Sequence, residues 1–171
     1  MIDPQQNSAK FLTVEEAQTV DGAMLSTMEK FMTRITISSM RVLAHIAKSY
    51  NVHAEELQID QIVAWIEKDA RIRREQGDAA AFLQWSSSGS DADDEIEFED
   101  TISDRVTGAQ LSSNEKFLTR MTISAMPVLS AIAKDYDTHV EELTVTQTIA
   151  WIENDAKIKR EQGVDSAFLR W

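Results

Sequence analysis

The chain has 171 residues, of which 43% are hydrophobic and 27% are charged, and its formal net charge is −12. It contains no cysteine, which excludes disulfides and cysteine-ligated zinc. It also lacks a basic, apolar leader and any apolar run of the roughly 18 to 20 residues that span a bilayer. These features predict a cytoplasmic protein with no membrane partner.

The sequence contains one small unit twice. Residues 20–85 align without a gap on residues 106–171 at a constant offset of 86, and about 40 of the 66 aligned positions are identical. A period this long indicates a repeated domain, because solenoid repeats run at about 20 to 50 residues. A unit of this size buries only about 60% of its unfolded surface. We therefore expect the two units to share a core around an internal pseudo-two-fold axis.

The charge is concentrated between the two units. Residues 86–105 carry −7 of the net charge, whereas the first and second units carry only −1 and −2. Serine, glycine and mutually repelling carboxylates predict an extended spacer in this segment. The chain is therefore divided into an N-terminal extension (1–19), a first unit (20–85), an acidic linker (86–105) and a second unit (106–171).

Each unit is predicted to begin with a capped helix. Capping boxes occur at Ser26–Glu29 and Ser112–Glu115. Apolar residues follow at alternating steps of three and four, which is the spacing of a helical seam. Proline cannot sit in a straight helix interior without losing a hydrogen bond, and Pro127 occupies the position of Arg41. We therefore predict a break near residues 37–40 and 123–126, with the following helix ending at Tyr50 and Tyr136.

A further helix is predicted in each unit before a short apolar tail. In the second unit, Thr144–Gln147 forms a capping box for its start, and Gly77 and Gly163 mark the two ends. The tails contain large side chains that we expect to clamp the bundle: Phe82, Leu83 and Trp85, and Phe168, Leu169 and Trp171. The predicted fold is all-α, a tandem duplication of a small helical unit forming a pseudo-two-fold fused dimer.

The segment from Ile46 to Leu57 resembles a helix-turn-helix motif, with a recognition helix that would begin at His53. That helix would present Glu55 and Glu56 to nucleic-acid phosphates, although affinity for DNA comes largely from Lys and Arg. A turn used only for packing is therefore the favoured interpretation.

Basic residues gather near the end of the last helix in both units. They could bind an anionic partner, or they could complement the helix dipole and pair with nearby acids, which is the role that we favour. The linker acids, including Asp93 and Asp94, could also fold over these cations. With the two terminal tryptophans they form the set of candidate partner-binding residues: Arg71, Arg73, Arg74, Trp85, Lys157, Lys159, Arg160 and Trp171.

Residues typical of catalysis or of bound cofactors are scarce in the sequence. Two pairs, His53 with Glu56 and His139 with Glu142, could meet at the two-fold axis and bind a metal. Helix-start roles for these glutamates are favoured, so we assign no metal and no cofactor. There is no thiol, glycine-rich phosphate loop or Ser-His-Asp arrangement at helical spacing.

The sequence therefore predicts a non-enzymatic protein-interaction module, an adaptor, inhibitor or regulatory partner, which binds another protein as a monomeric chain. The alternative is a nucleic-acid-binding regulator that uses the turn or the basic helix ends.

Overall fold

The structure, a computed structural model, describes residues 12–83 and 105–171. Trp85 and residues 86–104 of the acidic linker lie outside these ranges, and so does the predicted contact between the linker acids and the basic residues. The described residues form helices and no strand, which confirms the all-α prediction. In chain order the elements are α2 (Val14–Asp21), α3 (Thr27–Tyr50), η1 (Ala54–Glu56), α4 (Ile59–Gln76), η2 (Asp78–Ala80), α6 (Ser113–Asp135), η3 (Val140–Glu142), α7 (Val145–Gln162) and η4 (Val164–Ser166).

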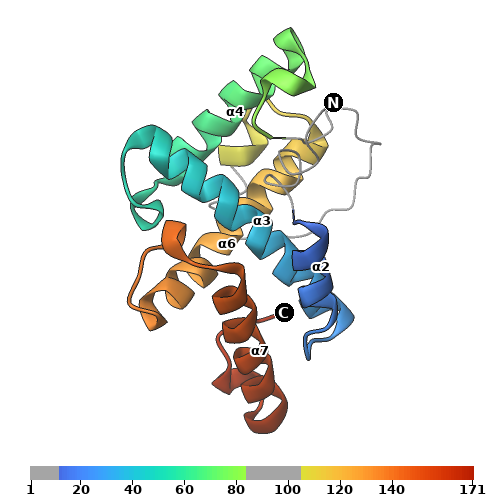
Figure 1. Ribbon diagram of the computed structural model, residues 1–171. Coiled ribbons are helices and arrows are strands. Elements are labelled where there is room, and N and C mark those ends of the chain that lie inside the picture. The colour runs from blue at the N-terminus through green and yellow to red at the C-terminus, as the bar shows by residue number, and fades with distance from the viewer. Residues whose placement is uncertain (1–11, 84–104) are drawn as a thin grey trace.

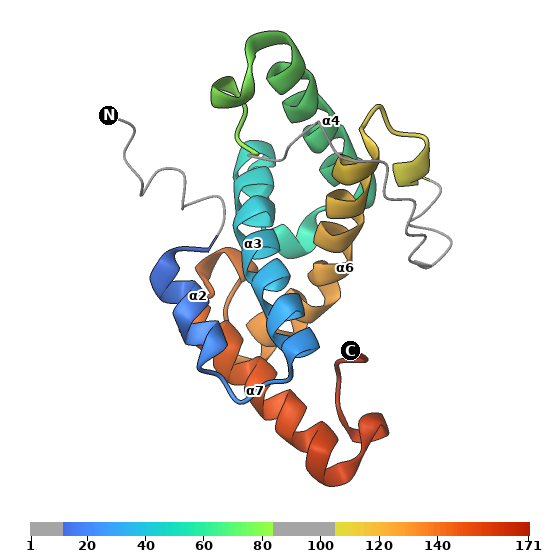
Figure 2. The same ribbon diagram turned by 90° about the vertical axis from the view of Figure 1, so that its right-hand side faces the viewer.

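The two long helices, α3 and α6, cross and pack against each other at the centre (Figure 1). Each of them also contacts the last long helix of the other unit: α4 packs against α6, and α7 packs against α3. Figure 2 shows the result, with α4 beside the start of α6 at one end and α7 beside the start of α3 at the other. The two units are therefore interlocked, and their contacts repeat as the predicted pseudo-two-fold arrangement requires.

Local sequence signals set the helix ends. The capping boxes of Ser26 and Ser112 are present at the starts of α3 and α6, and that of Thr144 is present at the start of α7. The helices α4 and α7 end at Gly77 and Gly163, whose φ angles of 94° and 98° favour glycine over any residue with a Cβ. These predicted boundaries are confirmed.

The predicted breaks within α3 and α6 are wrong, because both helices continue without interruption. Pro127 lies inside α6 at an exposed position. Its fixed φ suits a helix, and the missing N–H removes only one hydrogen bond of α6. The long apolar interface with α3 then keeps the helix whole.

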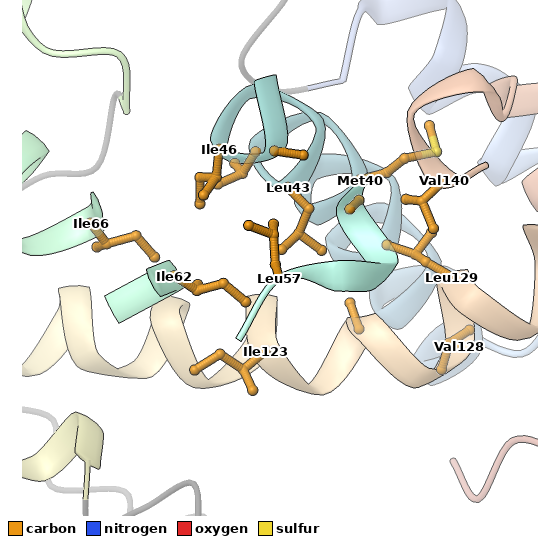
Figure 3. Packing of buried hydrophobic residues seen from close by; sticks show 14 of the residues in the cluster. Met40, Leu43, Ile46, Leu57, Ile62, Ile66, Ile123, Val128, Leu129 and Val140 are labelled. Atoms are coloured by element: carbon orange, nitrogen blue, oxygen red, sulfur yellow. The ribbon is translucent and has the colours of Figure 1, made fainter. Parts of the chain in front are cut away.

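The two units share one hydrophobic core, as predicted. Figure 3 shows side chains of α3 and α6 that point toward one another, with residues of α4, of the segment before it and of η3 among them. The labelled residues are Met40, Leu43, Ile46, Leu57, Ile62, Ile66, Ile123, Val128, Leu129 and Val140. Because neither unit alone encloses this cluster, the pairing of the units supplies the burial that a domain of this size lacks.

A buried ion pair joins α4 to α6. Arg73 is 3% exposed and pairs with Glu115, which is fully buried. Arg73 also donates to the Leu83 carbonyl oxygen at 2.9 Å, and Asp69 accepts from the backbone N–H of Leu83 at 3.0 Å. One network therefore holds the end of α4, the tail after it and the start of α6.

The equivalent pair in the other half is more exposed. Lys159 of α7 lies 3.1 Å from Glu29 at the start of α3, and the lysine side chain is 19% exposed. Asp155 holds the second tail through the N–H groups of Phe168 and Leu169 at 2.8 and 3.0 Å. The predicted clamping by the tails is confirmed for Leu83 and Leu169, which are buried in the shared core, whereas Phe168 is 49% exposed.

The substitution Glu115→Gln should destabilise the protein by about 1 to 3 kcal/mol, because the buried Arg73 would lose one carboxylate and keep only Asp69, at 3.4 Å, as a counter-charge. Glutamine still completes a capping box, so the start of α6 is preserved. The matched variant Glu29→Gln should cost less, since Lys159 reaches solvent. Urea unfolding of both variants measures the difference, and equal losses would contradict the assigned role of burial.

Acid should weaken the same contact. Burial raises the pKa of Glu115, but hydrogen bonds from Ser112 and the charge of Arg73 outweigh it and hold the pKa below the ordinary 4.5. The resulting stability is fully present above the ordinary pKa and is lost as pH falls through the lowered one. Wild type should therefore lose more unfolding free energy on acidification than Glu115→Gln. Parallel pH profiles from urea unfolding would contradict this.

Candidate partner-binding groove

Apolar side chains are exposed along the first turns of α3. Met28 and Phe31 are 61% and 48% exposed, and Met24, just before the helix, is 75% exposed. Residues three and four apart lie on the same side of a helix, so Met28 and Phe31 lead toward Ile35 one turn further on. We call Met24, Met28, Phe31 and Ile35 the α3 stripe.

The α3 stripe leads into an apolar cavity of about 220 Å³. Residues of α3 form one side, α6 contributes Leu118, Met121 and Thr122, and Leu12 closes one end. Ile35 and Met121 occupy equivalent positions in the two units, so the cavity lies on the boundary between them. Its volume is below the roughly 300 to 1,000 Å³ of ligand pockets, and it suits one or two apolar side chains.

The wall beside the cavity is fixed by ion pairs. Arg34 pairs with Asp21, and Arg41 pairs with Glu16, so α2 is tied to α3. Burial alone would raise the pKa of Glu16. Hydrogen bonds from Thr13 and the Arg41 guanidinium outweigh this effect, so the pKa lies below its ordinary value. Glu16 is therefore ionised at neutral pH, and the pair with Arg41 stays charged.

The second unit keeps only half of the α3 stripe, since Phe117 and Met121 stand at the positions of Phe31 and Ile35. The positions of Met24 and Met28 are taken by Gln110 and Asn114 in the second unit. Neither Met24 nor Met28 belongs to the shared core. Helical periodicity alone does not reveal them as a surface, but Asn114 in an otherwise apolar seam indicates that the equivalent turn of α3 is partly exposed.

The predicted partner-binding cations divide into two groups. Arg73 and Lys159 form the internal pairs described above, so the structure gives both of them a role inside the protein. Arg74 is exposed but also lies 3.9 Å from Glu115. The other cations are exposed, and their role toward a partner, like that of Arg74, stays a prediction: Arg71, Lys157 and Arg160. Arg160 lies beside the α3 stripe, because its Nη1 donates to the Met24 carbonyl oxygen at 3.5 Å.

The two predicted tryptophans also differ. Trp171 is partly buried against the shared core, and its carbonyl oxygen accepts from Lys159 at 3.0 Å. Trp85 lies outside the described residues, so its role stays a prediction.

The helix-turn-helix interpretation is wrong. The predicted recognition helix is only the three-residue turn η1, and the chain is extended again at Leu57 before α4 begins. The turn packs against the equivalent turn η3 of the other unit. It therefore lacks the length that a DNA groove requires.

The two histidines meet at the two-fold axis, as predicted, but the glutamates that face them are not the predicted ones. His53 and His139 stack across the two units. Glu56 and Glu142 instead accept from the backbone N–H groups of His53 and His139 at 2.8 and 3.4 Å, within their own turns. The carboxylates facing the imidazoles across the axis are those of Glu141 and Glu55.

No curated protein and no solved structure matches the chain. Among the described residues, no helix is both long enough and apolar enough to cross a membrane. A family model described as "NDH complex assembly factor CRR9" matches residues 12–92 and again residues 99–171. The two matches cover most of the chain and follow the internal repeat. The chain therefore belongs to the CRR9 family and contains the family's characteristic region twice.

Proposed function

We propose that the chain is a non-enzymatic assembly factor that binds a protein component of the NDH complex through the α3 stripe and the adjoining cavity. The family description supports an assembly role with protein partners. The observation that carries the proposal is the exposure of Met24, Met28 and Phe31 on one unit alone. Exposed apolar surface of this kind marks interaction sites.

The partner segment that fits best is an amphipathic helix. Recognition of such a helix uses apolar anchors at positions i, i+3, i+4 and i+7 that fill an apolar groove. The cavity of about 220 Å³ has room for one or two such anchors. The flexible side chains of Met24 and Met28 can adapt to the remaining anchors of the partner helix. Arg160 beside Met24 places a cation at the rim, where it would favour an acidic residue flanking the anchors.

The nucleic-acid alternative has less support. The turn from His53 to Leu57 packs against the other unit, and three of the repeated cations are engaged in internal pairs. The cytoplasmic location stays a prediction, as do the boundaries of the four segments.

The double substitution Met24→Gln and Met28→Asn tests the proposal with residues that the second unit already carries at the equivalent positions. Losing two exposed apolar anchors should weaken partner binding at least about tenfold without changing the melting temperature. The measurement is recovery of NDH-complex proteins with the tagged full chain from cells that assemble the complex, quantified by mass spectrometry.

The control is Val164→Asp, which removes another exposed apolar side chain and introduces the residue found at position 78. It should leave recovery unchanged. Equal recovery of NDH-complex proteins by the double variant and wild type would overturn the α3 stripe as the docking surface. Gel-shift assays with DNA and RNA at low and high salt test the alternative, because phosphate binding weakens with salt.

A further inference from the structure

Two histidines from different units meet face to face. The ring centroids of His53 and His139 are 3.6 Å apart, and their planes differ by 6°. Each histidine directly precedes the short turn of its unit, η1 or η3, and each is followed two residues later by a glutamate. The close packing of η1 on η3 therefore brings four groups able to ligate a metal to the boundary between the units.

Each imidazole faces the glutamate of the opposite unit. The Nδ1 atom of His53 lies 2.6 Å from Oε1 of Glu141, and that of His139 lies 3.7 Å from Oε2 of Glu55. Backbone groups fix both carboxylates, since Glu141 accepts from the N–H of Ala54 at 3.2 Å and Glu55 from that of Val140 at 2.8 Å. The carboxylates are thus held in position before any ligand binds.

One carboxylate oxygen in this cluster is unsatisfied. Oε2 of Glu55 is buried and has no hydrogen-bond partner, because the His139 nitrogen at 3.7 Å is too distant. Buried polar atoms are nearly always paired, so this oxygen beside the His139 imidazole is available to a further ligand. The equivalent glutamate, Glu141, meets its histidine at hydrogen-bond distance.

We propose that this cluster binds one divalent transition-metal ion of the zinc type, with His53, His139 and Glu141 as ligands and Glu55 as the fourth. Ligand atoms of the first three already lie within 4.8 Å of one another. Imidazole nitrogen with carboxylate oxygen is a ligand set of Zn²⁺, whereas Ca²⁺ and Mg²⁺ take oxygen alone. The histidine side chains are 51% and 47% exposed, so the rings can turn to bring their nitrogens to the roughly 2.0 to 2.1 Å of zinc sites.

The ion would act as a clasp between the units. The ligands come from both units, so binding requires the units to be paired. A ligand that binds only the folded state stabilises the protein. This stabilisation grows with the logarithm of the ligand concentration once that concentration exceeds Kd. Added Zn²⁺ should therefore raise the melting temperature of the full chain.

Calorimetric titration of the metal-free full chain with Zn²⁺ at mildly alkaline pH tests the site. We expect one ion per chain, and binding weakened at least about tenfold by His53→Ala, His139→Ala or Glu141→Gln. The control His45→Ala replaces the third histidine with the residue of the equivalent position 131, and Glu56→Gln alters a carboxylate that bonds its own turn. Both controls should bind as wild type does.

A second measurement separates loss of the site from loss of the fold. The Zn²⁺-dependent rise in melting temperature should disappear in Glu141→Gln while circular dichroism shows the wild-type helix content. Absence of Zn²⁺ binding by the wild type would overturn the proposal. So would unchanged binding in the His53, His139 and Glu141 variants, or an equal loss in the two controls.

Discussion

The buried contact between Arg73 and Glu115 lies where three segments meet. Glu115 caps the start of α6 and neutralises the arginine, and the arginine holds the tail after α4. Removing two charges from water is costly, and the network offsets this cost only when every partner is in place. A shift of α4 by one turn along α6 would separate the charges in an apolar surrounding. The pair therefore fixes how the two units are aligned as well as holding them together.

The helices could be predicted from local sequence signals. The roles of single residues could not, because they depend on which residues of the other unit contact them. Capping serines and terminal glycines act within one turn of the chain, so Ser26, Ser112 and Gly163 were identified correctly. The break at Pro127 was wrong because packing against α3 outweighs the loss of one hydrogen bond. Arg73 resembled a surface cation at a helix end, since nothing in its own unit reveals that Glu115 of the other unit covers it.

The groove and the histidine cluster illustrate the same limit. The apolar periodicity of α3 predicts Met28 as part of the helical seam. Periodicity alone does not show that the first turn of α3, which carries Met28, lies beyond the helix that covers the rest of the seam. The sequence placed both histidines at the axis and yet paired them with Glu56 and Glu142, three residues away. In the short turns η1 and η3, those glutamates bond their own backbone, and the carboxylates two residues away reach across. Helical spacing was the wrong rule for a turn of three residues.

The contrast between Met28 and Asn114 bears on what covalent fusion of two such units permits. In a dimer of identical chains, every substitution appears on both sides of the axis, so an apolar contact surface gained by one protomer is gained by the other. Two such surfaces on one particle would invite bridging between neighbouring particles. In a fused chain, the two units can change independently. The internal contacts can stay duplicated while only one unit carries an exposed apolar surface, so that the chain can bind its target with a stoichiometry of one.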